Sequence, residues 1–253
     1  MRFLKLTIAY DGAAYVGWQV QDNGITVQQR LEEAWTAVTQ ETIRITASGR
    51  TDSGVHAEAQ VCSLTTESKI DCQTLIRALN AKTPEDISVT NVQEAPEGFH
   101  AIGDAIGKTY RYQIQHGRIL NALTRNTHWF RPYVLDVNAM KKAAEYLTGE
   151  YDFASFQAVG AERKSTVRNL SRLELQAFRK KTFDYLHIEL TSNGFLYNMV
   201  RNIVGVLVRV GRGSEKPEWA KTVLEQCDRN HQGQTAPAHA LFLVEVDYPP
   251  LIP

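Results

Sequence analysis

The chain has 253 residues, enough for one large domain or two modest ones, each with its own hydrophobic core. Its hydrophobic fraction of 43% and charged fraction of 22% are those of an ordinary globular protein, and no apolar run reaches membrane-spanning length. With 28 basic and 28 acidic residues the net charge is zero, which excludes nucleic-acid binding driven by bulk charge. The N-terminus lacks a signal-peptide pattern and the three cysteines are scattered, so we expect a cytoplasmic protein with reduced thiols and no membrane contact.

The first hundred residues predict the element order β-α-β-β-α-β. Alternating apolar residues and short apolar runs indicate strands at 4–10, 43–47, 59–65 and 87–92. A first helix should begin after Thr26, which can form a capping box with Gln29. A second helix should begin after Asp71 and end before Pro84. This order is that of a ferredoxin-like unit.

The same order starts again at Lys108. Strands are indicated at 108–114, 170–178, 183–190 and 241–248. Asp136 should cap a helix that Gly149 stops, an apolar stripe from Met199 to Val210 indicates a long helix, and a short one should start near Pro217. We therefore predict an α+β fold of two ferredoxin-like halves, residues 1–105 and 106–253.

Basic residues are concentrated in the second half. The cluster consists of Arg163, Lys164, Arg168, Arg172, Arg179, Lys180 and Lys181, followed by Arg201, Arg209 and Arg212. Such a cluster is typical either of a solvated charged face or of a local surface that binds phosphates.

The segment GRTDSGVHA, residues 49–57, places a cation, a carboxylate, an imidazole and two glycines within nine residues. The guanidinium of Arg50, two residues before Asp52, would favour the ionised carboxylate and so lower its pKa, as nucleophilic or base chemistry requires. The competing interpretation is a simple turn in which Asp52 bonds its own backbone.

Other chemistries fit the sequence less well. An aspartic-protease site would need two Asp-Ser-Gly triplets with apolar flanks, whereas this chain has one triplet after Arg50 and Thr51. The histidines lack metal-ligand spacing, and neither a dinucleotide-binding nor a phosphate-loop motif occurs, so we expect no metal and no cofactor.

Six motifs, in order along the chain, resemble the bacterial tRNA pseudouridine synthase A family. They are AYDGAAYVGWQVQ (9–21), TVQQRL (26–31), GRTDSGVHA (49–57), YRY (110–112), FASFQA (153–158) and NGFLYNMVRNIVGVLVRVGRG (193–213). The resemblance spans nearly the whole chain. It implies two ferredoxin-like halves joined in one extended, mostly antiparallel sheet with helices on one face and a catalytic cleft between the halves.

The resemblance also implies an activity. The reaction breaks the N1–C1′ bond of a uridine in tRNA, rotates the base and joins C5 to C1′. The family's substrate is the anticodon stem-loop at positions 38 to 40, and its members are homodimers. A catalytically silent RNA-binding module is the alternative interpretation.

The implied catalytic residues are Asp52, Tyr110 and Arg201. Asp52 acts as nucleophile or base, and Arg201 either pairs with it or bonds elsewhere. Tyr110 either stacks on the uracil and assists at C5, or is a core residue.

The implied substrate-binding residues are Arg50, His56, Tyr110 and Leu241. Arg50 would replace the flipped base in its stack or pair with Asp52, and Leu241 would line the base pocket. His56 is expected either to contact RNA or to pack the loop.

Two departures from the family pattern are visible. After Phe99-His100-Ala101 the family commonly continues Arg-Phe-Ser, whereas residues 102–104 here are Ile-Gly-Asp. The apolar residue near the end usually follows glycine, whereas here Ala240 precedes Leu241. The first departure removes one expected RNA-contacting arginine.

Overall fold

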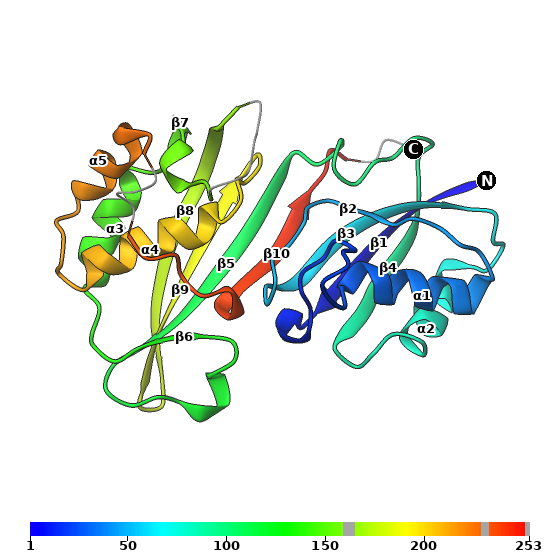
Figure 1. The fold of residues 1–253 in the computed structure, drawn as a ribbon, viewed down its shortest axis with the longest axis horizontal. Coiled ribbons are helices and arrows are strands. Elements are labelled where there is room, and N and C mark those ends of the chain that lie inside the picture. Colours follow the sequence, from blue (N-terminus) through cyan, green and yellow to red (C-terminus); the bar gives the residue numbers. More distant parts are fainter. Residues whose placement is uncertain (159–164, 229–232, 251–253) are drawn as a thin grey trace. The chain divides into compact units, whose positions relative to one another are not determined.

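The computed structural model describes residues 1–158, 165–228 and 233–250. The chain forms two compact units, residues 1–106 with 242–253, and residues 107–241 (Figure 1). Each unit combines a mostly antiparallel sheet with helices, which confirms the α+β class. In the part of the chain that the structure describes, no helix is both long and apolar enough to span a bilayer.

The sheet of the first unit has the strand order expected of a βαββαβ unit. Its strands are β1 (Arg2–Tyr10), β2 (Thr46–Ala47), β3 (His56–Thr66), β4 (Ile87–Ala95) and β10 (Leu241–Asp247). β1 lies between β4 and β3, antiparallel to both, and the other edge of β3 pairs with β2. That edge also pairs in parallel with β10, at His56 and Ala57. Residues 242–250, which we assigned to the second half, therefore group with the first unit.

Two helices cover one face of this sheet, α1 (Val27–Thr39) and α2 (Cys72–Asn80) (Figure 1). Both predicted caps form: Thr26 Oγ1 accepts from Gln29 N at 3.3 Å, and an Asp71 carboxylate oxygen accepts from Thr74 N at 2.9 Å. The Gln29 side chain, the other member of the predicted capping box, donates from Nε2 to Glu33 Oε1 at 2.9 Å. The core between the layers consists of fully buried apolar side chains, including Leu4, Leu6, Ile8, Leu31, Trp35, Leu75 and Leu79.

The first three long strands of the second unit are arranged like the first three strands of the first unit, with the third strand between the first and the second. Its strands are β5 (Gly107–His116), β6 (Trp129–Arg131), β7 (Gly149–Asp152), β8 (Val167–Lys180) and β9 (Phe183–Ser192). β9 lies between β5 and β8 and is antiparallel to both. The short strands β6 and β7, which sequence patterns did not indicate, extend the pairing on β5 and β8.

The helices of this unit are α3 (Val137–Glu145), α4 (Met199–Gly211) and α5 (Trp219–Gln226). Asp136 caps α3 as predicted, with Ala139 N donating to Oδ1 at 2.9 Å. Gly149 does not stop α3, which ends at Glu145; with φ +132° it begins β7 instead. The stripe on α4 is confirmed, and nearly every α4 side chain is buried, as expected of a helix packed on several sides.

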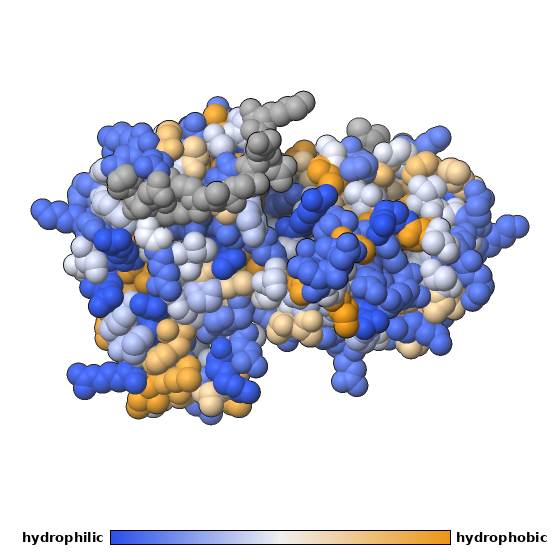
Figure 2. Space-filling model, viewed as in Figure 1, coloured by the Kyte–Doolittle hydropathy of each residue, from blue (hydrophilic) through white to orange (hydrophobic). Residues whose placement is uncertain are grey.

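An apolar surface patch lies over the segment between β5 and β6, at the lower left of the space-filling view (Figure 2). Ile119 is 71% exposed and Leu123 90% exposed. The segment is nevertheless tightly held, because the buried Gln115 side chain donates to Ile119 O at 2.7 Å and accepts from Asn121 N at 2.9 Å. These apolar side chains are therefore displayed from an ordered loop.

Candidate active site

Asp52 lies on the loop that leads from β2 into β3, and the loop rests on the segment after β1. Gly17 and Asp52 form an antiparallel bridge, and Trp18 N donates to Thr51 O at 3.1 Å. On the other side of Asp52, Gly54 N donates to Tyr15 O at 3.3 Å and Ser53 Oγ donates to the same carbonyl at 3.2 Å. Asp52 itself is half-buried. The backbone is thus fixed on both sides of the carboxylate.

Two glycines allow this close packing. A Cβ on Gly12 would lie 1.9 Å from Val55 O, and one on Gly17 would lie 2.8 Å from Thr51 O. Gly17 also has φ +115°, in the region that favours glycine. The motif at residues 9–21 is therefore the surface on which the Asp52 loop lies.

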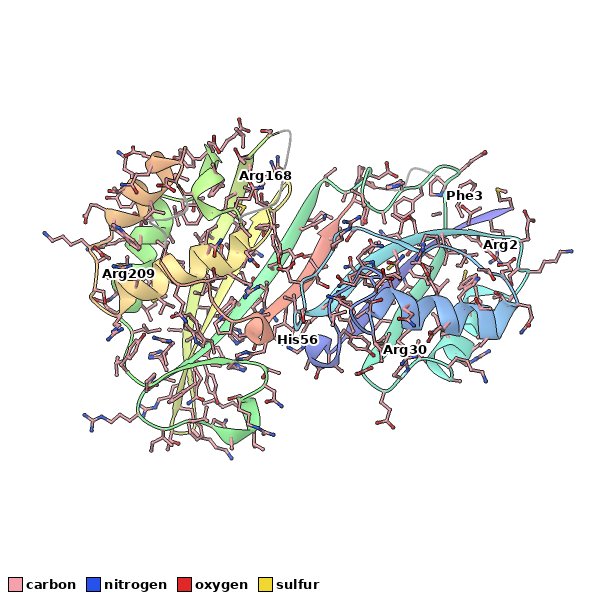
Figure 3. All side chains as sticks on the ribbon, viewed as in Figure 1. Arg2, Phe3, Arg30, His56, Arg168 and Arg209 are labelled. Atoms are coloured by element: carbon pink, nitrogen blue, oxygen red, sulfur yellow. The ribbon has the colours of Figure 1, made fainter. Side chains whose placement is uncertain are left out.

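Of the other predicted residues on this loop, Arg50 is exposed and His56 is 2% exposed. The ring of His56, which is labelled in Figure 3, stacks on that of Phe242 with 4.5 Å between ring centroids. Its Nδ1 lies 3.1 Å from Gly12 N and 3.0 Å from Asp11 Oδ1. Since one nitrogen cannot both accept from the amide and donate to the carboxylate, the tautomer selects the contact. In this position His56 packs the loop.

In the second unit, Tyr110 is on β5 and Arg201 on α4. Tyr110 is 8% exposed and meets Phe195 edge-on, with 5.1 Å between ring centroids. Arg201 Nε donates to Ala236 O at 2.6 Å, and its Nη1 donates to Asn198 Oδ1 at 2.8 Å. These bonds fix the plane of the guanidinium.

The segment 234–237 packs against α4 and leads towards Leu241. Thr235 Oγ1 donates to Asn202 Oδ1 at 2.7 Å, while Asn202 Nδ2 donates to Phe156 O at 2.8 Å. A Cβ on Gly205 would lie 2.0 Å from Gln234 O, so only glycine allows this approach. Leu241, 5% exposed, follows the short 3-10 turn Ala238–Ala240. The α4 motif thus positions both Arg201 and the segment before Leu241.

The six predicted residues form two groups. Arg50, Asp52 and His56 share one loop of the first unit. In the second unit, Arg201 holds Ala236, five residues before Leu241, and Tyr110 packs on Phe195, shortly before α4.

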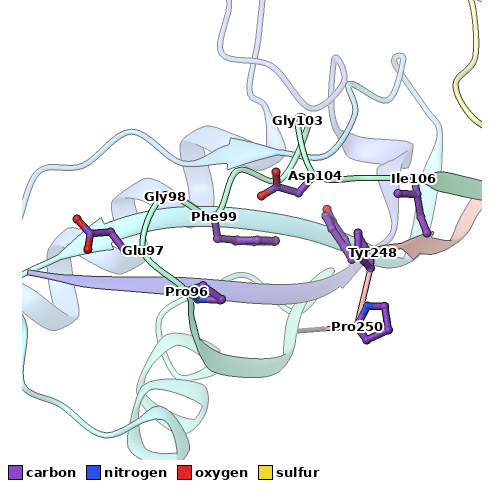
Figure 4. A pocket seen from close by; sticks show the side chains of 10 residues that line it. Pro96, Glu97, Gly98, Phe99, Gly103, Asp104, Ile106, Tyr248 and Pro250 are labelled. Carbon is purple, nitrogen blue, oxygen red and sulfur yellow. The ribbon is translucent and has the colours of Figure 1, made fainter. Parts of the chain in front are cut away.

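A groove of the first unit coincides with the departure from the family pattern at 102–104 (Figure 4). Its walls include Pro96, Phe99, Tyr248 and Asp104, and none of the six predicted residues lines it. Within the turn, Ile102 N and Gly103 N donate to His100 Nδ1 at 3.2 and 3.0 Å, and His100 N donates to Asp104 Oδ2 at 2.8 Å. The turn is thus closed by its own side chains, with Ile102 54% exposed.

The basic residues of the second unit differ in their surroundings. Arg163 and Lys164 lie outside the described residues. Arg172 bonds Glu189 at 3.2 Å and Arg209 bonds Glu215 at 3.0 Å, so part of their charge is neutralised locally. Arg179 is 3.6 Å from Asp184, while Lys180 and Lys181 are exposed at the hairpin. The hairpin end is thus the more accessible part of the cluster.

Sequence reasoning missed residues that hold the predicted ones in place. In the first unit, the hydroxyls of Tyr10 and Thr51 are 2.8 Å apart and both residues are buried. In the second unit, Asn198 (φ +61°) bonds Arg201. The available signal was the pair of glycines in the motif after β1, whose purpose becomes visible only with the loop packed on them.

Comparisons with known proteins identify the family of this chain. The family model described as tRNA pseudouridine synthase matches residues 6–102 and 143–249. "tRNA pseudouridine synthase A 2" of Clostridium perfringens is 44% identical, covering 98% of this chain and 100% of that protein. "tRNA pseudouridine synthase A" of Caldicellulosiruptor bescii is 43% identical over 98% and 100%, and that of Coxiella burnetii is 40% identical over 99% and 94%.

Among solved structures, "Structure of H/ACA RNP bound to a substrate RNA containing 2'-deoxyuridine" has a TM-score of 0.36 and 10% identity, over 81% of this chain and 44% of that one. A score this low supports no argument. The sequence matches and the α+β fold define an RNA-modifying isomerase. The chain belongs to the tRNA pseudouridine synthase family, which confirms the resemblance noted from its motifs.

Proposed function

We propose that the chain converts uridine to pseudouridine at positions 38 to 40 of the tRNA anticodon stem-loop, with Asp52 as its catalytic carboxylate. The synthase activity follows from membership of the family, and the stem-loop positions and the role of Asp52 extend it. The observation that supports the role of Asp52 is its place on a loop whose backbone is hydrogen-bonded on both sides. A carboxylate that must meet C1′ or C6 needs a fixed position, because a misplacement of about 1 Å can cost about 100-fold in rate.

The other residues have roles that fit their contacts. Arg201, fixed through Ala236 O and Asn198, would orient the Asp52 carboxylate. Tyr110 would stack on the detached uracil and assist proton removal at C5, and Leu241 would line the base pocket. Arg50, exposed on the loop, would take the place of the extruded base, whose flipping costs a few kcal/mol. His56 would act through the loop that it packs.

The proposal is tested with tRNA that carries tritium at uridine C5. The wild-type protein should release tritium to water, and Asp52→Ala should release none while it still binds the tRNA. Undiminished release by Asp52→Ala would refute the catalytic role. Binding of tRNA by the wild-type protein without any release would instead support the RNA-binding module.

The same family relationship supports a homodimer in the cytoplasm. Sedimentation equilibrium of the purified protein should give twice the 28.5 kDa of one chain. A single species of 28.5 kDa at micromolar concentration would contradict the dimer.

A further inference from the structure

The hydroxyl of Tyr10 forms a hydrogen bond with the hydroxyl of Thr51, the residue that precedes Asp52 on the loop. The two oxygens are 2.8 Å apart, and the side chains are 5% and 6% exposed. Tyr10 is the last residue of β1, and its ring lies 6.1 Å from that of Trp18. A buried hydroxyl that loses its partner is costly, so this pair ties the loop to the strand.

Thr51 is held through two different parts of the residue. Its carbonyl accepts from Trp18 N, and its side chain meets Tyr10, so both its backbone and its χ1 angle are constrained. Because Thr51 immediately precedes Asp52, its backbone dihedrals set the direction in which the Asp52 side chain leaves the loop.

Strand β1 provides a rigid anchor for this contact. It is an interior strand of its sheet, paired with β3 on one side and β4 on the other, and Tyr10 itself is in register with Ala57 and Ile87. The hydroxyl pair therefore connects the loop to a strand that is hydrogen-bonded along both edges.

We propose that Tyr10 and Thr51 are positioning residues for catalysis, whose hydroxyl pair aims the Asp52 carboxylate at the uridine. This inference rests on the proposed role of Asp52. Neither residue touches the substrate; each acts by limiting how far the carboxylate can drift from its reactive position.

The test compares Tyr10→Phe and Thr51→Val, which keep the shape of the side chain and remove one hydroxyl each. Each variant should lower kcat by about tenfold and leave KM for tRNA within about twofold, because the loop is displaced while the RNA-binding surface is kept. The double variant should lose no more than either single variant, since both remove one interaction. Thr51→Ser, which keeps the hydroxyl, should restore most of kcat.

Thr66→Val is the matched control. Thr66 is also a buried residue of the first unit, at the end of β3 remote from His56 and the Asp52 loop, and its hydroxyl donates to the Glu41 carboxylate. It should lower the unfolding temperature by a similar amount and leave kcat unchanged. An equal loss of kcat in Thr66→Val would show a merely structural effect and overturn the inference.

Unchanged kcat in both Tyr10→Phe and Thr51→Val would also overturn it. Asp52→Ala separates the two proposals: if it is inactive while these variants keep full kcat, only the positioning inference fails. If Asp52→Ala is active, the role of Asp52 itself fails.

Discussion

The Asp52 loop of the first unit and the Arg201 region of the second unit are held in place by different means. The loop is fixed mainly by main-chain hydrogen bonds to residues 15–18 and by close backbone approach at Gly12 and Gly17. Arg201 lies on a regular helix and is fixed by side-chain bonds to Ala236 O and Asn198. A carboxylate on a short side chain must be placed by its backbone, whereas a long arginine is placed at its tip.

The largest effects should come from adding one methyl group at a close backbone contact in either unit. In Gly12→Ala the new Cβ would meet Val55 O at 1.9 Å, and in Gly205→Ala it would meet Gln234 O at 2.0 Å. Each should lower the free energy of unfolding by about 3 kcal/mol or more, because neither backbone can yield freely. Urea unfolding measures this.

Gly103→Ala is the control for both, since its nearest neighbour would be His100 Nδ1 at 3.6 Å, an ordinary contact. A loss below about 1 kcal/mol in Gly12→Ala would show that the loop can shift away from residues 12–18 and contradict the backbone-held loop.

The next effect concerns the tip of Arg201. Arg201→Lys keeps the charge but cannot offer the planar fork that bonds Ala236 O and Asn198 Oδ1 together. We expect kcat to fall by about 100-fold while the unfolding temperature changes little, and steady-state kinetics with tRNA measure this. Wild-type kcat in Arg201→Lys would show that charge alone suffices and that the fixed plane is irrelevant.

A smaller effect distinguishes the contribution of the Asn198 backbone conformation to stability from the contribution of its side chain to activity. Asn198 has φ +61° and accepts from Arg201. Asn198→Gly should keep the fold and lose activity moderately, because only the acceptor is removed, whereas Asn198→Ala should in addition lower stability by about 1 kcal/mol. Thermal unfolding and kcat, measured together, test this; equal stability of the two variants would contradict the backbone contribution.

The last effect is a pH dependence that belongs to the second unit. Burial, and then the nearby His187 and His239, lower the pKa of His128 from 6.5 to about 4. Below pH 6.5 the unfolded chain therefore binds a proton that the folded chain refuses, so the free energy of unfolding should fall as pH drops from about 6.5 to about 4. Urea unfolding across this pH range should show a shallower fall in the free energy of unfolding for His128→Gln than for the wild-type protein. An equally steep fall in this variant would contradict the assignment of the pH dependence to His128.

Much of the fold could be predicted because its signals are local. Thr26, Asp71 and Asp136 mark helix starts through bonds to amides three residues later, and each such bond is present. Gly149 misled because a glycine after a helical stretch can either end the helix or, as here with φ +132°, begin a strand.

The candidate site was predictable only in part. Asp52 stands out in the sequence because its loop concentrates charged residues between glycines. The Tyr10–Thr51 pair is invisible there, because its members are 41 residues apart and meet only when β1 and the loop pack together. Likewise, the bond between Arg201 and Ala236 spans 35 residues without any pattern that links them.

We propose that the Asp52 carboxylate starts the reaction. The most direct measurement is a single-turnover reaction of Asp52→Asn with excess enzyme and an unmodified tRNA that carries uridine at position 39, followed by mapping of pseudouridine. Asn keeps the size of the side chain and removes its charge, so we expect tRNA binding close to wild type and no pseudouridine. Formation of pseudouridine at position 39 at a rate near that of the wild-type protein would contradict it.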